Sequence, residues 1–196
     1  MGSSKTKKIA VLALQGAFVE HEKRLRNLGA ECVEIRQKAD LMQDMDGLIL
    51  PGGESTVQGK LLTRLGMLQL LRDRIRSGLP VLGTCAGLIL LAGELGKDEP
   101  AWLGTLPVRV RRNAYGRQLG SFWVNGEFQG IGRVPMTFIR APYVESAGEG
   151  VEILAVVENR IVAVRYGNQL GIAFHPELDE DERIHKMFLN MCRQGF

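Results

Sequence analysis

Short apolar runs alternate with helical patterns along the first half of the chain, and this alternation is the strongest constraint on its fold. The continuous apolar run from Ile9 to Leu14 is typical of a strand that is covered on both faces. Strands that alternate with helices predict an α/β fold in three layers, built on a doubly wound, mostly parallel sheet. The other strands are expected at Cys32 to Ile35, Gly47 to Leu50 and Pro80 to Leu82, and the helices at about Phe18 to Leu28, Val57 to Leu65 and Leu68 to Ile75.

After Pro100 the pattern changes to strands without helices between them. Gly167-Asn168 joins two of these strands and predicts a tight hairpin. We therefore expect the second half to add antiparallel strands to the sheet, followed by a last helix from about Asp181 to Arg193. The strand-like stretches are Val108 to Arg111, Ser121 to Val124, Val134 to Ile139, Val151 to Val157, Ile161 to Tyr166 and Gln169 to Phe174.

Length and charge suit one domain that binds neither nucleic acid nor membrane. The chain has 196 residues and a net charge of +3, which is too mild to favour nucleic acid or an anionic lipid surface. No apolar run approaches the length of a membrane helix. We expect residues 9–196 to form a single domain and residues 1–8 to be a disordered tail or the remnant of an expression tag.

The cysteines favour a reducing compartment. Cys32, Cys85 and Cys192 are widely spaced and form no C-x-x-C pair, so we predict a cytoplasmic protein with free thiols. Cys32 lies in a strand pattern and Cys192 near the end of a helix, and core packing is expected for both. No cluster has the spacing of metal ligands, and neither a metal nor a cofactor is expected.

Gly83-Thr84-Cys85-Ala86-Gly87 lies between a strand pattern and an apolar helix predicted from Leu88 to Leu95. A nucleophile flanked by small residues between strand and helix is the pattern of a nucleophile elbow, a sharp turn that exposes the central side chain. The start of a helix also favours a thiolate over a thiol. Cys85 is thus a candidate nucleophile, although a small buried cysteine of the core fits this stretch as well.

His175-Pro176-Glu177 follows the strand pattern that ends at Phe174. The carboxyl ends of parallel strands meet along one edge of an open sheet, so His175 and Cys85 can meet in space. An imidazole can keep a thiol ionised and then protonate the leaving group, and a carboxylate such as that of Glu177 can orient it. Taken alone, the stretch also fits an ordinary loop before a helix. His21 and His185 lie in helical patterns without such context, so solvated surface positions are expected for both.

Pro51-Gly52-Gly53-Glu54-Ser55-Thr56 ends a strand pattern and precedes a helix. One interpretation is a turn in which Ser55 or Thr56 caps the helix. The other is an oxyanion hole, in which backbone N–H groups of Gly52 and Gly53 act together with that of Ala86.

Arginines cluster at Arg109, Arg111, Arg112 and Arg117, and Arg140 lies further along the chain. Basic residues that alternate on a strand commonly form a solvated face. An arginine fork also matches a substrate carboxylate, so one of the four is a candidate for that contact. Arg140 is a candidate for a carboxylate or for a partner surface.

Together these motifs resemble the class I (triad) glutamine amidotransferases, whose fold is flavodoxin-like, and more narrowly the glutaminase subunits of pyridoxal 5′-phosphate synthase. The likeness runs from about Ile9 to the C-terminus. It rests on Leu14-Gln15-Gly16-Ala17 with Glu20-His21, Gly52 to Thr56, Thr84 to Ala92, Arg112 to Gln118, Phe138 to Pro142 and Phe174 to Leu178.

The resemblance implies hydrolysis of L-glutamine to glutamate and ammonia. Cys85 would be the nucleophile, His175 the base and then the acid, and Glu177 the residue that orients it. Gln15 would lie close to the oxyanion hole and to the interface with a synthase subunit, which receives the ammonia within a large hetero-oligomer. The residues expected to hold glutamine are Gly53, Glu54, Ser55, Arg112, Ile139 and Arg140.

Three other functions fit parts of the same pattern. A triad glutaminase could supply a different synthase, such as that of histidine biosynthesis. A cysteine peptidase or chaperone-like hydrolase could use a related fold. An interaction module without activity is the third alternative, but it would not need Cys85, His175 and Glu177 together.

Overall fold

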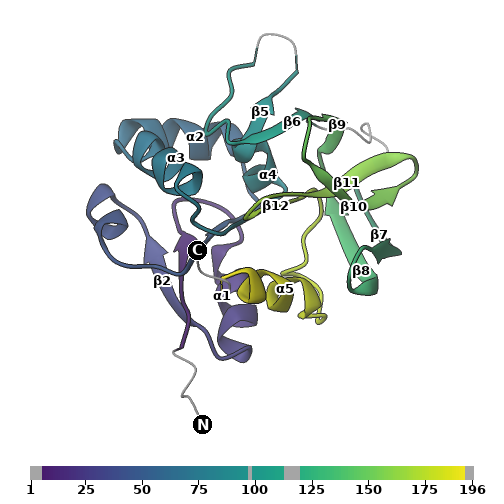
Figure 1. Ribbon diagram of the computed structural model, residues 1–196, viewed down its shortest axis with the longest axis horizontal. Coiled ribbons are helices and arrows are strands. Elements are labelled where there is room, and N and C mark those ends of the chain that lie inside the picture. Colours follow the sequence, from purple (N-terminus) through teal and green to yellow (C-terminus); the bar gives the residue numbers. More distant parts are fainter. Residues whose placement is uncertain (1–5, 97–98, 113–119, 193–196) are drawn as a thin grey trace.

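The computed structural model describes residues 6–96, 99–112 and 120–192, and its centre is a curled, mostly parallel sheet (Figure 1). Four parallel strands form the first half of the sheet. They are β1 (Lys8–Leu12), β2 (Glu31–Ile35), β3 (Gly47–Leu50) and β4 (Val81–Thr84), with β1 between β2 and β3 and with β4 next to β3. Strands β1, β3 and β4 are almost wholly buried, as expected of strands that are covered on both faces.

The second half extends this sheet from β4. The order of the main sheet is β2-β1-β3-β4-β12-β11-β9-β6-β5, with β10 paired to β11. Strand β12 pairs parallel with β4, and β11, β9 and β10 are antiparallel to their neighbours. The bounds are β5 (Ala92–Glu94), β6 (Leu106–Arg111), β9 (Tyr143–Ala147), β10 (Glu152–Val157), β11 (Arg160–Tyr166) and β12 (Gln169–Ile172).

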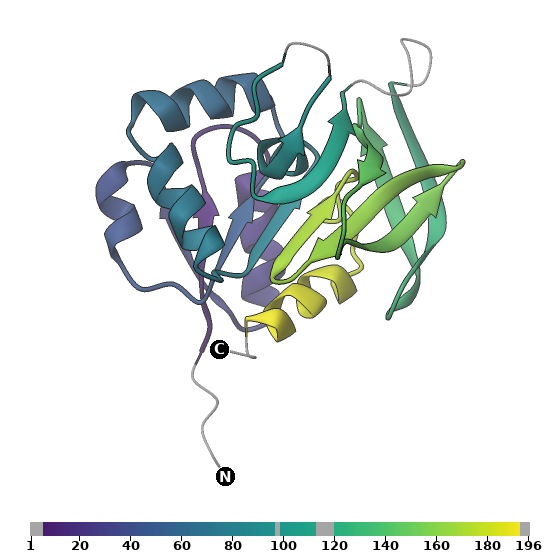
Figure 2. The same cartoon turned by 45° about the horizontal axis from the view of Figure 1, so that its top comes forward.

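Helices cover both faces of the main sheet, which confirms the predicted doubly wound α/β fold (Figures 1 and 2). Helix α4 packs on the face to which Gly83 points, and α5 packs on the opposite face, where Gly47 lies against Phe188 and Cys192. Cys192 is thus buried in the core, as expected. The helices are α1 (Phe18–Asn27), α2 (Ser55–Arg64), α3 (Leu68–Arg76), α4 (Ala86–Leu91) and α5 (Arg183–Met191), with a short 3₁₀ helix at Lys38–Met42. Within the described ranges, none of the helices has the length and apolar character needed to cross a membrane.

Three expectations about these elements are wrong. Strands β7 (Ser121–Phe128) and β8 (Gly132–Ile139) pair only with each other and form a separate hairpin at one end of the molecule (Figure 2). The helix after Cys85 ends at Leu91 because the chain enters β5, which pairs with β6. Lys7 and Lys8 are not part of the tail, since the Lys8 N–H donates a hydrogen bond of 2.8 Å to Asp46 and the Lys7 ammonium pairs with the same carboxylate. Residues 1–5 of the expected tail lie outside the described residues.

Candidate active site

Cys85 occupies a strained turn between β4 and α4. Its backbone has φ 49° and ψ −100°, a conformation that costs energy for any residue other than glycine. The turn is held in place because the Cys85 N–H donates to the Ile172 carbonyl (2.7 Å), while the Cys85 carbonyl accepts from Ile89 (3.2 Å). The backbone therefore makes the strand–turn–helix bend that the sequence predicts for a nucleophile elbow.

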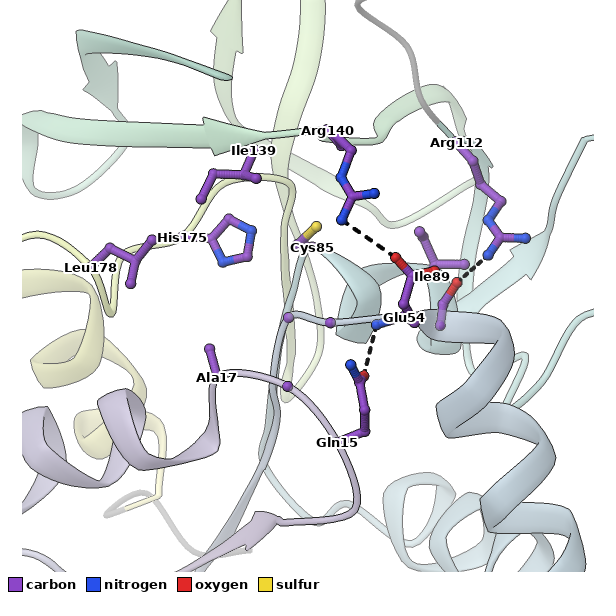
Figure 3. Close-up of a pocket in the computed structure, with 14 residues that line it drawn as sticks. Gln15, Ala17, Glu54, Cys85, Ile89, Arg112, Ile139, Arg140, His175 and Leu178 are labelled. Carbon is purple, nitrogen blue, oxygen red and sulfur yellow. Dashed lines mark hydrogen bonds and ion pairs between the residues drawn. The ribbon is translucent and has the colours of Figure 1, made fainter. Parts of the chain in front are cut away.

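His175 and Glu177 lie beside this elbow because β12 is the parallel neighbour of β4. Ile172 pairs with Thr84 in the sheet, so the segment after β12 leaves the same edge as Cys85. The His175 imidazole points toward the Cys85 thiol (Figure 3). Its Nδ1 lies 2.7 Å from Glu177 Oε1, and its backbone N–H donates to the Thr137 carbonyl on β8 (2.8 Å).

The pKa values of this pair are shifted in opposite directions. Burial opposes the charged form of His175, but hydrogen bonds and charge interactions with Cys85 and Glu177 outweigh burial and raise its pKa to about 10. Burial likewise opposes ionisation of Glu177, but His21 and His175 beside it lower the pKa of that carboxyl. The geometry thus stabilises an imidazolium next to the thiol and a carboxylate behind it.

A cavity of about 340 Å³ opens directly onto Cys85 and His175. Glu177 is 2% exposed and lies behind His175, and neither Glu177 nor Ala86 lines the cavity. Every other residue expected in the triad, the glutamine site or the oxyanion hole does line it. The lining residues are Gln15, Gly16, Ala17, Gly52, Gly53, Glu54, Ser55, Cys85, Ile89, Arg112, Ile139, Arg140, His175 and Leu178.

The glycine loop after β3 is fixed by the loop after β1. The Gly52 carbonyl accepts a hydrogen bond from the Ala17 N–H (3.0 Å), and the Gln15 side-chain oxygen accepts one from the Glu54 N–H (2.8 Å). Gln58, a buried residue that the sequence did not single out, donates to the Gln15 carbonyl (2.9 Å) and to the Pro51 carbonyl (3.2 Å). The two loops therefore behave as one unit along the cavity wall.

Helix α2 starts differently from the prediction that Ser55 or Thr56 caps it. The N-cap residue is Glu54, which makes no side-chain cap bond, and both hydroxyls lie within the first turn. They accept hydrogen bonds from Arg112 Nη2, at 2.6 Å for Ser55 and 2.9 Å for Thr56. The two hydroxyls therefore bind Arg112 and do not cap the helix.

The arginines divide into pocket and surface residues. Arg112 also donates from Nη1 to Glu99 (2.8 Å), and Arg140 Nη2 lies 3.6 Å from Glu54 Oε1 across the cavity mouth (Figure 3). Arg109 and Arg111 do not line the cavity. They pair with carboxylates on neighbouring strands, as expected of residues on a solvated face. Arg117 and the adjoining Asn113 to Gln118 motif lie outside the described residues.

The family model described as the SNO glutamine amidotransferase family matches residues 11–194. The chain belongs to the SNO glutamine amidotransferase family. It is therefore a glutamine amidotransferase, which confirms the enzyme class and the family predicted from the motifs.

Two relatives of this SNO-family member share most of its sequence. One is pyridoxal 5′-phosphate synthase subunit PdxT of Desulfitobacterium hafniense (strain Y51), which is 64% identical over 188 residues, 96% of this chain and 94% of that protein. The protein of the same name from Streptococcus pneumoniae serotype 2 (strain D39 / NCTC 7466) is 57% identical over 190 residues, 95% of this chain and 98% of that protein.

Solved structures agree with the fold of this SNO-family chain. One described as a crystal structure of a glutamine amidotransferase has a TM-score of 0.90 at 46% identity, covering 94% of this chain and 98% of the other. PurLQS from Thermotoga maritima has a TM-score of 0.72 at 17% identity, covering 95% and 98%, and supports the fold alone.

The prediction that the side chains of His21 and His185 are exposed to solvent is wrong. Both are 0% exposed, and His21 lies behind the elbow, against Thr84 and Glu177. A count along the helix faces would have found them. His21 precedes the buried Leu25 by one turn, and His185 lies on the same apolar face as Phe188.

The carboxylates, cysteines and histidines that the structure describes include no group of three or more placed to bind a metal ion. Cys32 is partly buried, and burial is the main cause that raises the pKa of its thiol to about 11. Burial also raises the pKa of the Cys192 thiol, to about 12. Of the three free thiols, only that of Cys85 lines the cavity of this SNO-family enzyme.

Gly52 offers a direct test of this geometry. A methyl group on Gly52 would overlap Cε1 of His175 and lie 2.9 Å from its Nδ1 and 3.5 Å from Cβ of Cys85. Gly52→Ala should therefore displace the imidazole and lower kcat for glutamine hydrolysis by on the order of 10²-fold, because catalytic groups tolerate little displacement. Steady-state kinetics would measure this. A kcat equal to that of the wild type would contradict the packing of Gly52 against His175.

Proposed function

We propose that this chain is the glutaminase subunit of a pyridoxal 5′-phosphate synthase, which hydrolyses L-glutamine and supplies ammonia for vitamin B6 synthesis. The observation that carries the proposal is Cys85 in a strained elbow beside the His175–Glu177 pair, facing a cavity. The name PdxT shared by relatives at 64% and 57% identity supports the choice of synthase.

In the proposed reaction the Cys85 thiolate attacks the carbon of the side-chain amide. The imidazolium of His175 gives its proton to the amide nitrogen, the C–N bond breaks, and ammonia leaves behind a glutamyl thioester. The neutral imidazole then takes a proton from a water molecule, whose oxygen attacks the thioester. Glutamate leaves, the Cys85 thiolate returns, and His175 is again protonated. Glu177 orients the imidazole and stabilises its charge throughout.

The cavity wall supplies groups of both charges for an amino acid. Arg140 and Glu54 face each other at the mouth, and they match the α-carboxylate and the α-ammonium of glutamine in charge. Ser55, held by Arg112, and Ile139 would complete the binding site with Gly53. Backbone N–H groups of the Gly52-Gly53 loop and of Ala86 would form the oxyanion hole. Gln15, bound to this loop, would lie next to it.

The proposed partner is the synthase subunit, with which this chain would form a large hetero-oligomer. Ammonia released into neutral water is mostly protonated and loses its nucleophilicity, so a partner that shields it makes the transfer useful. We expect the complex to work in the cytoplasm, where the three free thiols stay reduced. The proposed chemistry needs only the protein's own side chains and no cofactor.

The test is a reconstitution with purified synthase subunits. In the presence of the pyridoxal 5′-phosphate synthase subunit and its sugar phosphates, cofactor formation from glutamine should require this chain. An ammonium salt should replace glutamine and this chain together. The absorbance of the product and the release of glutamate are the measurements. Product formed only with the synthase of histidine biosynthesis would overturn the choice of partner. Peptide cleavage without glutamate release would overturn the reaction.

A further inference from the structure

Two buried histidines continue the line of catalytic side chains behind Glu177. Glu177 uses Oε1 to contact His175, and its Oε2 is buried without a hydrogen bond among the described residues. The imidazole nitrogen Nε2 of His21 lies 3.4 Å from this Oε2 atom. The same Nε2 lies 3.0 Å from the hydroxyl of Thr84, which precedes the nucleophile. His21 Nδ1 in turn lies 3.0 Å from His185 Nε2.

These contacts select one arrangement of protons. A lone pair on His21 Nε2 would repel the carboxylate, so the proton belongs on Nε2 and is shared between Thr84 and Glu177. Nδ1 of His21 is then an acceptor, and His185 must donate to it from Nε2. This leaves a bare lone pair on His185 Nδ1, which agrees with the finding that this buried atom lacks a partner in the described structure.

We infer that His21, with its proton held on Nε2 by His185, is a positioning residue that keeps the Glu177 carboxylate ionised and directed at His175. This inference rests on the proposed function, because it gives His21 a role only through the triad. At 3.4 Å the contact with Oε2 is long for a hydrogen bond, so His21 acts mainly through the dipole of its N–H group.

Both histidines are neutral near pH 7 in this environment. Burial lowers the pKa of His21, and burial lowers that of His185 to about 3. The ionisable groups that act on His21 and His185 are Glu177, His175 and, on α1, Glu20 and Arg24. The side chain of Arg24 also donates to the Glu177 carbonyl at 3.3 Å. A neutral donor thus supports the carboxylate without adding a charge that would compete with the His175 imidazolium.

The sign of the pH effect follows from Glu177. Its pKa is depressed in the folded protein, so the carboxylate is present above that value and is lost as pH falls through it. Removing the His21 N–H takes away the donor that faces Oε2 at 3.4 Å, so protonation of Glu177 begins at a higher pH. The acidic limb of the activity profile must therefore move upward in pH.

The experiment measures kcat, KM and the pH profile of glutamine hydrolysis by the complex with the synthase subunit. His21→Leu should lower kcat by about 10-fold, the lower end of the range for losing a hydrogen bond to a charged group, because a contact of 3.4 Å is weaker than such a bond. KM should stay nearly constant because His21 does not line the cavity. The acidic limb should shift to higher pH. His21→Gln, whose amide can again place an N–H near Glu177, should recover most of the activity.

His185 and a packing control separate positioning from mere structure. In His185→Leu the His21 proton is no longer fixed on Nε2, so kcat should fall, but by less than in His21→Leu. His185→Gln can still donate to His21 and should behave like the wild type. Phe188→Leu alters the buried face of α5 next to His185, so it should lower the melting temperature without moving the acidic limb. Equal losses in His21→Leu and His21→Gln, with an unmoved acidic limb, would overturn the inference. So would wild-type kinetics in a folded His21→Leu variant.

A second measurement uses the isolated chain without the synthase subunit, and it also serves variants that do not form the complex. Mass spectrometry can follow the alkylation of Cys85 by iodoacetamide in the isolated chain as a function of pH. Cys32 and Cys192 serve as slow internal references, since the pKa values of their thiols are raised to about 11 and about 12. His21→Leu should slow the alkylation of Cys85 at acidic pH relative to the wild type, because a protonated Glu177 no longer supports the His175 imidazolium, and an unchanged rate counts against the inference.

The proposed function can fail separately from this inference. If Cys85→Ala or His175→Asn still hydrolyses glutamine at the rate of the wild type, the proposed triad is wrong. If both are inactive while His21→Leu matches the wild type in kcat and in pH profile, only the positioning role falls.

Discussion

Cys85→Ala is expected to abolish glutamine hydrolysis, lowering kcat by on the order of 10⁴-fold or more, because no covalent intermediate can form. The fold should survive. Alanine is smaller than cysteine and removes only a sulfur that faces the cavity. Glutamate release in the presence of the synthase subunit measures the loss, and circular dichroism checks the fold.

Cys32→Ala is the matched control, since it removes another free thiol that lies in β2, away from the cavity. It should keep full activity. Product formation by Cys85→Ala with ammonium salt should also match the wild type, because the synthase then bypasses the glutaminase. If Cys85→Ala retained glutamine hydrolysis, the nucleophile would have to be another group.

Gly87→Ala is expected to produce the largest loss of stability among single methyl additions at the elbow. A methyl group there would overlap the carbonyl oxygen of Leu50 on β3 and lie 2.8 Å from its carbonyl carbon and 3.0 Å from its Cβ. The obstacle is backbone in the middle of the sheet, which cannot turn aside as a side chain can. We expect a loss of about 3 kcal/mol in the free energy of unfolding, at the upper end of the range for overpacking.

Gly120→Ala is the control for this change, because a methyl group on Gly120 would meet no heavy atom within 4 Å. Its free energy of unfolding should differ from the wild type by less than about 0.5 kcal/mol. Chemical denaturation of both variants gives the comparison. Equal stability of the two would contradict the close contact between α4 and β3.

Much of the fold was predictable because its elements have simple sequence patterns. Strand β3 is a continuous apolar run between turn residues, and its predicted bounds, Gly47 to Leu50, match the structure. The separate β7–β8 hairpin was not predictable, since alternation along a strand does not reveal which strand it pairs with. The short β5 follows α4 without a break, and its residues, Ala92–Glu94, fit a helix as well as a strand.

The candidate site divides in a similar way. Cys85, His175 and Glu177 stand at strand ends, where an open parallel sheet brings distant residues together. The contact of Arg112 with Ser55 and Thr56 depends on how β6 approaches α2, and no local pattern encodes it. The burial of His21 and His185 likewise depends on α1 and α5 lying side by side, which becomes clear only when both helices are placed.

The hairpin of β7 and β8 is joined to the main sheet by side-chain packing and a few single backbone hydrogen bonds, without strand pairing. Ile139 and Arg140 form part of the cavity wall from the end of β8, and the Thr137 carbonyl on the same strand holds the backbone of His175. This hairpin does not pair with the main sheet. A local opening of the hairpin would therefore release His175, the proposed base, while the main sheet stayed folded. We therefore expect heat inactivation to precede melting of the main sheet, and amide exchange in β8 would report the earlier event.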